Sequence, residues 1–256
     1  MIYTKNYPTP EWNERECLRY AGTTPQYISA EERELFDACL LEAENKLTYK
    51  VCWGRFPVKR GENSLDFGFL QTDSKALMKN LEGCEEVIVF AATIGLEIDR
   101  LIRRYTSLSP AKALFFQAIG AERIESLCDA FCDELKENGL QLRPRFSPGY
   151  GDLPLELQKD VFRVLDCPRK IGLSLNESLL MSPSKSVTAI IGIGGRAEEE
   201  KNKCSACQKS DCATEDEVYE FFRIFETEYP VSGRRYGYTF AGGRAAARRT
   251  PRTLEF

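Results

Sequence analysis

The chain has 256 residues, with 35 lysines and arginines against 39 aspartates and glutamates, and its formal net charge is -4. With 43% hydrophobic and 29% charged residues, it is too apolar for a disordered protein and too charged for a membrane protein. No stretch reaches about 18 consecutive apolar residues and the N-terminal residues show no signal peptide, so we expect a cytoplasmic protein without membrane contact.

Hydrophobic periodicity predicts an α+β fold in which helices pack on a central, mostly antiparallel twisted sheet. Helical patterns dominate the first 140 residues, and Ser29 and Glu32 form a capping box ahead of one of them. Helices are predicted, in chain order, over residues 30–47, 74–81, 98–105, 110–139, 155–165 and 214–225. Strands are predicted over residues 49–56, 87–95, 140–146 and 186–193.

We expect a single main domain followed by a flexible basic tail. Residues 1–139 make up its helix-rich part, residues 140–230 carry the sequence motifs described below, and residues 231–256 form the tail. The last 25 residues contain six arginines and one glutamate, so contact with nucleic acid or an anionic surface is one interpretation and a solvated tail is the other. The acidic remainder of the chain argues against a dedicated nucleic-acid binder.

Two features of the sequence limit the reactions and the cofactors that this chain could support. The chain contains no histidine, which excludes a catalytic triad, a histidine-ligated metal and an imidazole acid–base step. Residues 192–197 formally match a dinucleotide-binding fingerprint. Three glutamates at 198–200 follow where a phosphate would bind, however, so a turn at a strand end is the better interpretation.

Ten cysteines suggest thiols or metal ligands, because a chain of this size without a secretion signal has little need of disulfides. Cys204, Cys207 and Cys212 lie within nine residues in a C-x2-C-x4-C pattern, a spacing typical of zinc or iron–sulfur sites. Cys167, next to a proline, is the predicted fourth ligand. Redox-active thiols and thiols without function are the alternatives.

A third motif joins an arginine to a stiff turn and an aromatic ring. Arg145 is followed by Pro148, Gly149 and Tyr150. A guanidinium group can hold a carboxylate with two hydrogen bonds, and a tyrosine ring can pack against a flat or sulfonium-bearing ligand. The alternative is a structural turn with a surface ion pair.

This motif also carries a family resemblance. It is followed, 27 residues after Tyr150, by the run Glu177-Ser-Leu-Leu-Met181-x-Pro183-x-x-Ser186-Val187. The two motifs, in this order, resemble the activation domain of cobalamin-dependent methionine synthase in a short, free-standing form. The resemblance covers roughly residues 20–200.

The resemblance implies a protein that binds S-adenosylmethionine (AdoMet) and supports the reactivation of a cobalamin enzyme. Arg145 matches the arginine that grips the methionine carboxylate, Tyr150 matches the aromatic residue beside it, and Pro148 and Gly149 shape the loop. Ser186 and Val187, which begin the next strand, complete the cofactor-binding residues. No side chain needs to act as an acid or a base, which suits a chain without histidine.

The cobalamin itself would be held by a separate methionine synthase or another corrinoid protein, acted on in trans. In this family a flavodoxin-type donor reduces cob(II)alamin, and the reduced cobalt takes the methyl group from AdoMet. The chain departs from the family at Gly151-Asp-Leu-Pro154 and at residues 198–200, where full-length members have an aromatic pair.

Two other functions remain open from the sequence. The cysteine cluster would suit an iron–sulfur or zinc-binding electron-transfer partner of a corrinoid protein. The departures from the family motif would suit a non-catalytic binding module whose AdoMet pocket has decayed.

Overall fold

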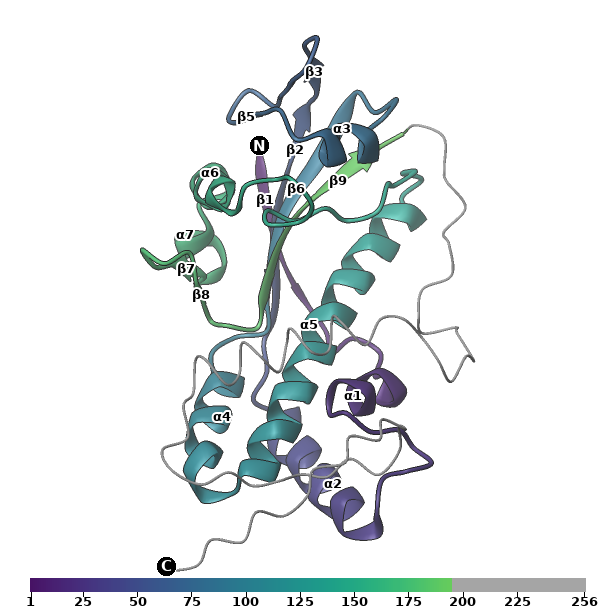
Figure 1. Cartoon of the computed structure of the whole chain (residues 1–256), viewed down its shortest axis with the longest axis vertical. Helices are drawn as coiled ribbons and strands as arrows, with labels where there is room; N and C mark the ends of the chain where they lie inside the picture. The colour runs from purple at the N-terminus through teal and green to yellow at the C-terminus, as the bar shows by residue number, and fades with distance from the viewer. Residues whose placement is uncertain (195–256) are drawn as a thin grey trace, which may run out of the picture. The chain divides into compact units, whose positions relative to one another are not determined.

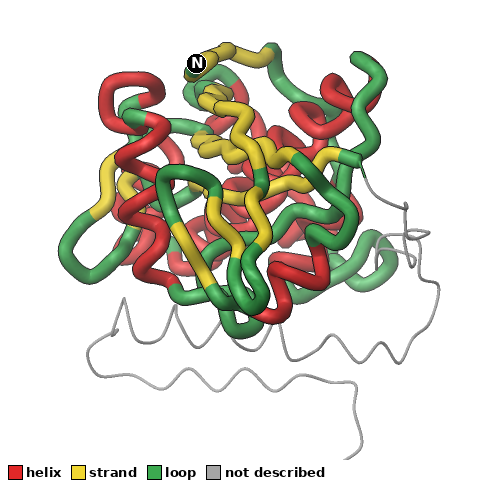
Figure 2. Tube along the Cα trace, turned by 90° about the horizontal axis from the view of Figure 1, so that it is seen from above, coloured by secondary structure: helices red, strands yellow, loops and turns green. Residues whose placement is uncertain are grey.

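In the computed structural model, which describes residues 1–194, a four-stranded antiparallel sheet has helices on both faces (Figures 1 and 2). The strand order is β1–β2–β6–β9. The strands of this sheet are β1 (Ile2–Tyr7), β2 (Tyr49–Pro57), β6 (Glu86–Thr93) and β9 (Ser186–Ile193). The α+β class and the antiparallel sheet predicted from the sequence are therefore confirmed.

The helices vary widely in length. They are α1 (Glu14–Tyr20), α2 (Ala30–Glu44), α3 (Lys75–Asn80), α4 (Glu97–Leu108), α5 (Pro110–Glu137), α6 (Gln158–Leu165) and α7 (Cys167–Ile171). Short strands form two smaller sheets, β3 (Lys59–Arg60) with β4 (Leu65–Asp66) and β5 (Gln71–Thr72), and β7 (Ser174–Leu175) with β8 (Met181–Ser182). None of the helices in residues 1–194 combines the length and the apolar composition that a membrane span requires.

Strand β6 is buried on both faces, as its continuous apolar run predicts. Ile88, Phe90 and Ala92 pack with residues of α1, α2, α4 and α5, in what we call the α5 core. The odd-numbered residues of 87–91 pack with residues of α3, α6 and α7, in the α6 core. Because successive side chains of a strand point to opposite faces, this one strand joins the two cores.

The chain before α1 is fastened to α5 by a buried ion pair. Glu122 and Arg123 are 1% and 3% exposed, and the Glu122 carboxylate accepts a hydrogen bond from the Asn13 backbone N–H at 3.0 Å. The Arg123 guanidinium donates to the carbonyl oxygens of Pro10 at 2.9 Å and Glu11 at 2.8 Å. These bonds satisfy two charged groups that would otherwise be costly to bury.

Most predicted elements are present, with differences at their ends. The capping box of Ser29 and Glu32 is confirmed, and both of its hydrogen bonds form. The predicted helix over 155–165 begins as a 3-10 turn at Leu155–Leu157 before α6. Strand β1 and helix α1 have no clear hydrophobic pattern in the sequence and were not predicted. The predicted helix over 214–225 and the basic segment 231–256 lie outside the described residues.

The predicted strand over 140–146 is wrong. Only Leu142 and Phe146 form bridges to β9, opposite Ile193 and Ile190. Pro144 has no backbone N–H to donate, so the alternating apolar pattern could not be matched by a continuous ladder.

We expect Phe131→Ala to be strongly destabilising. The Phe131 ring is 1% exposed, and its centroid lies 5.0 Å from that of Phe90 and 5.3 Å from that of Trp53, so truncation leaves a cavity in the α5 core. The free energy of unfolding, measured by urea titration, should fall by about 3–5 kcal/mol. Leu41→Ala, at a side chain that is 72% exposed, is the control and should change it by less than about 0.5 kcal/mol. Equal losses in the two variants would contradict this packing.

Candidate functional site

A bulge places the residues of the arginine motif. Residues 143–145 lie between the bridges at Leu142 and Phe146, whereas only residues 191 and 192 lie between their partners on β9. The segment thus has one residue more than the strand it follows, and Pro144 sits in the middle of it. An extra residue of this kind bends a strand and changes where its side chains point.

The bulge sends two arginines to opposite faces of the sheet. Arg143 packs toward α3, and its Nε donates to the Asn80 carbonyl oxygen at 2.7 Å. Arg145 reaches α5, where its guanidinium lies between two carboxylates. In a regular strand, residues two apart share a face, so the bulge is what brings Arg145 to α5.

The Arg145 side chain is fixed by two ion pairs. Its Nη2 donates to Glu125 Oε2 at 2.8 Å, and its Nη1 lies 3.1 Å from Asp129 Oδ1. Burial by itself would lower the pKa of Arg145, but the nearby carboxylates of Glu125 and Asp129 favour the charged form, and the pKa is raised. The guanidinium is therefore permanently charged, although only 25% of the side chain is exposed.

One donor of this guanidinium has an incomplete set of contacts. Nη1 is buried and, despite its proximity to Asp129, makes no aligned hydrogen bond. We regard the 3.1 Å contact as electrostatic only, because the strength of a hydrogen bond depends on its angle as well as its length. Nη1 is therefore a buried donor that is held next to Asp129 by charge alone.

The turn after Arg145 is closed by its own backbone. The Gly149 N–H donates to the Leu153 carbonyl oxygen at 2.9 Å, and the Leu153 N–H donates to that of Tyr150 at 2.9 Å. Gly149 has a φ of 94° and Gly151 a φ of 54°, where side chains are disfavoured. A Cβ at Gly151 would also lie 3.0 Å from that of Ala76 in α3.

Pro148 is buried within this turn, whereas Tyr150 is at its surface. The Tyr150 ring is 59% exposed and meets the Phe146 ring edge to face, with centroids 6.1 Å apart. Pro148, Gly149 and Tyr150 thus form one turn, and Arg145 lies in the bulge that precedes it.

Asp152 ties the turn to the start of α3. Its carboxylate accepts hydrogen bonds from the backbone N–H groups of Lys75 at 2.8 Å and Ala76 at 3.1 Å, and from the Ser74 hydroxyl. These groups favour the ionised form, so the hydrogen bond from Ser74 and the two from the backbone lower the pKa of Asp152. The residue that departs from the family motif therefore has a structural role here.

Ser186 and Val187 lie apart from this turn along β9. They begin the strand, and Ser186 is four residues and about 13 Å from Ile190, which pairs with Phe146. The Ser186 hydroxyl lies 2.8 Å from both Thr93 Oγ1 and the Pro183 carbonyl oxygen, which secures the entry to β9. Their predicted role in binding stays a prediction.

The proposed metal ligands are only partly within the described chain. Cys204, Cys207 and Cys212 lie outside it. Cys167 is fully buried, and its hydrogen bond with the Cys52 thiol, followed by burial, raises its pKa far above the ordinary value. Metal binding needs a thiolate, so this environment is unfavourable for a ligand. Within residues 1–194, no group of three or more Cys, Asp or Glu side chains is placed to hold a metal ion.

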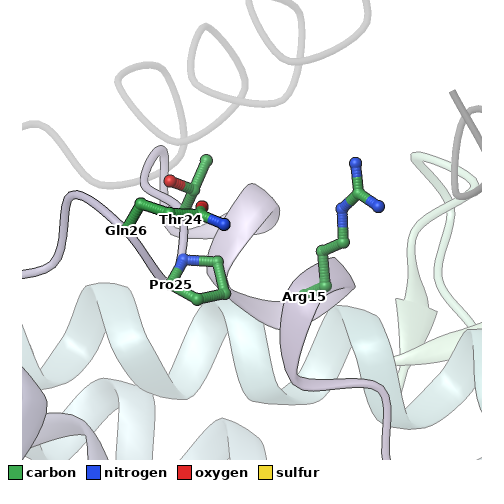
Figure 3. A pocket seen from close by; sticks show the side chains of 4 residues that line it. All are labelled: Arg15, Thr24, Pro25 and Gln26. Carbon is green, nitrogen blue, oxygen red and sulfur yellow. The ribbon is translucent and has the colours of Figure 1, made fainter. Parts of the chain in front are cut away.

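A separate pocket lies beside α1. It is lined by Arg15, which extends from the helix, and by Thr24, Pro25 and Gln26 of the segment that follows (Figure 3). None of its lining residues belongs to the motif around Arg145.

The ion-pair partners of Arg145 were not identified from the sequence. Glu125 and Asp129 are four residues apart, which places both carboxylates on the same face of α5. That spacing was visible, but which helix face would meet the turn depends on the bulge at Pro144.

The Asp152 contacts predict a pH-dependent contribution to stability. Because the folded-state pKa lies below its ordinary value of 3.8, the contribution is present above that value and is lost as the pH falls through the folded-state pKa. Asp152→Asn should therefore lower the melting temperature at neutral pH, and the difference from the unchanged protein should shrink in acid below 3.8. Glu85→Gln, at an exposed carboxylate, is the control. A difference independent of pH would contradict the role of the charge.

Comparisons with known proteins support the fold. No protein-family model matches the chain, and no curated protein matches it either. Among solved structures, the crystal structure of the MetH reactivation domain bound to AdoHcy is similar, with a TM-score of 0.55 at 18% identity. The match covers 75% of this chain and 78% of that chain. At this identity, the likeness shows that residues of this chain adopt the fold of that domain.

Proposed function

We propose that this chain binds AdoMet at the turn 145–150 and supports the reductive methylation of cobalamin carried by a separate protein. The observation that carries the proposal is Arg145, a charged guanidinium with one donor that makes no aligned hydrogen bond, five residues before the exposed side chain of Tyr150. An amino-acid carboxylate is the kind of ligand group that such a guanidinium binds well.

Each residue of the turn has a distinct part in this proposal. Arg145 binds the carboxylate of the methionine moiety, and the exposed Tyr150 ring packs against the adenosyl or sulfonium part of the ligand. Gly149, which has no side chain, leaves the backbone of the turn open to close approach. The contribution of the chain is then positioning, since methyl transfer from a sulfonium requires no acid or base.

The fold supports the same proposal. AdoHcy, the ligand of the similar reactivation domain, is the product that AdoMet leaves after it gives up its methyl group. The methyl acceptor would be a cobalamin held by a methionine synthase or another corrinoid protein, since the described chain has no histidine with which to ligate cobalt. A flavodoxin-type protein would supply the reducing electron.

A module with a decayed pocket is the competing interpretation. Its support is that Glu125 and Asp129 already neutralise Arg145, so a ligand carboxylate must compete with two built-in ones. A direct measurement of AdoMet binding distinguishes the two interpretations, because a decayed module has no affinity for AdoMet.

Calorimetric titration with AdoMet should give a micromolar affinity that depends on Arg145. Loss of a charge-assisted hydrogen bond costs about 1.5–3 kcal/mol, so Arg145→Ala should weaken binding roughly ten- to a hundredfold. Arg145→Lys should lie between the two, because it keeps the charge and loses the planar fork. Arg163→Ala, at an exposed arginine of α6, is the matched control and should bind normally. Equal affinities for Arg145→Ala and the unchanged protein would remove Arg145 from the site.

The cysteine cluster gives a second, independent prediction. If Cys204, Cys207 and Cys212 hold zinc or an iron–sulfur cluster, protein prepared anaerobically with iron and zinc supplied should contain about one metal site per chain. Cys207→Ser should lose it, because this residue belongs to both spacings of the motif. Cys167→Ser tests the fourth ligand, and unchanged metal content in that variant would exclude Cys167. Absence of metal from the unchanged protein would leave the three residues as ordinary thiols.

A further inference from the structure

Helix α3 holds the segment that contains the proposed binding turn at both ends of that segment. At the start of the helix, the Asp152 carboxylate accepts hydrogen bonds from the Ser74 hydroxyl and from the first two backbone N–H groups of α3. At the other end of the helix, Arg143 Nε donates to the Asn80 carbonyl oxygen at 2.7 Å. We call these contacts the two anchors of the segment 143–152.

The two anchors lie much closer together than the chain between them could reach. Ser74 and Asn80 are six positions apart, which corresponds to about 9 Å along a helix. The nine steps from Arg143 to Asp152 could span about 30 Å if the chain were extended. The segment must therefore fold back between its anchors, and the turn at 148–150 is the part that does so.

The end of α3 is itself fixed against the sheet, beside the end of β9 (Figure 1). A Cβ at Gly192 of β9 would lie 2.8 Å from the Leu81 side chain and 2.7 Å from the Cys84 sulfur, both in the segment that follows the helix. The Cys84 thiol also donates to the Gly194 carbonyl oxygen at 3.3 Å. Glycine allows this close approach because it has no side chain, so the anchors are attached to an element that cannot shift freely.

On the proposed function, we infer that Arg143 and Asp152 are positioning residues, which act through α3 to hold the turn in place for AdoMet. Neither has to contact the ligand, because Arg143 lies on the opposite face of the sheet from Arg145 and the Asp152 carboxylate already accepts from three donors. A turn that is ordered before binding lowers the free-energy cost of ordering it when the ligand binds. Asp152 belongs to the stretch that departs from the family motif, so this device is a feature of the present chain.

The test measures AdoMet binding by calorimetry in variants of the two anchors, well below their melting temperatures. Asp152→Asn, Ser74→Ala and Arg143→Met should each weaken binding about two- to tenfold, because the ligand must then order part of the turn. Arg143→Lys, which can still donate to the Asn80 carbonyl oxygen, should weaken it less than Arg143→Met. Glu156→Gln, which removes an exposed carboxylate four residues after Asp152, is the matched control and should bind normally. Should Arg143→Met not fold, because the residue is buried, the variants at Asp152 and Ser74 carry the test.

A double-mutant cycle with Tyr150 separates positioning of the turn from a general loss of stability. Asp152→Asn should have little effect on binding in protein that already carries Tyr150→Ala, since no ring is left to position. An equal loss with and without the Tyr150 ring, or normal binding by every anchor variant, would overturn the inference and leave the proposed function intact. Absence of AdoMet binding from the unchanged protein would instead overturn the proposed function, and the inference with it.

Discussion

Strand β6 is covered on both faces, and its burial sets the arrangement of the other elements. Hydrogen bonds to β2 and β9 occupy its two edges, while its alternate side chains enter the α5 core and the α6 core. A strand so enclosed must be apolar along its whole length, and residues 87–92 are. Displacing either layer would expose half of it to water, so the two layers are stable only together.

The candidate site depends on this arrangement through β9. One edge of β9 pairs with β6, and the other receives the segment from Leu142 to Phe146. That segment carries one extra residue at Pro144, so the two arginines beside the proline separate to opposite faces. One helps to hold α3, and the other lies between Glu125 and Asp129 of α5. Rigid elements on both sides thus fix a charged group whose proposed role is to orient a ligand.

The methyl transfer proposed for this site is compatible with the side chains that the chain contains. Methyl transfer from a sulfonium to reduced cobalt requires a bound and oriented donor, and no proton has to move. A chain without histidine can meet that requirement with a guanidinium and an aromatic ring.

The sequence by itself determined the features that arise from local or periodic patterns. The capping box at Ser29, the apolar run of β6, the long helix after Pro110 and the turn of Pro148 to Tyr150 are specified by neighbouring residues, and all are present. Strand β1 gave no such signal, because it is an edge strand with mixed exposure that forms only by pairing with β2. The same holds for the site. The motif around Arg145 could be recognised in the sequence. Three other features depend on residues far apart in the chain: the bulge at Pro144, its pairing with β9 and the contact with α5. Only the tertiary structure could decide them, because the face on which a side chain lies depends on the register between distant segments.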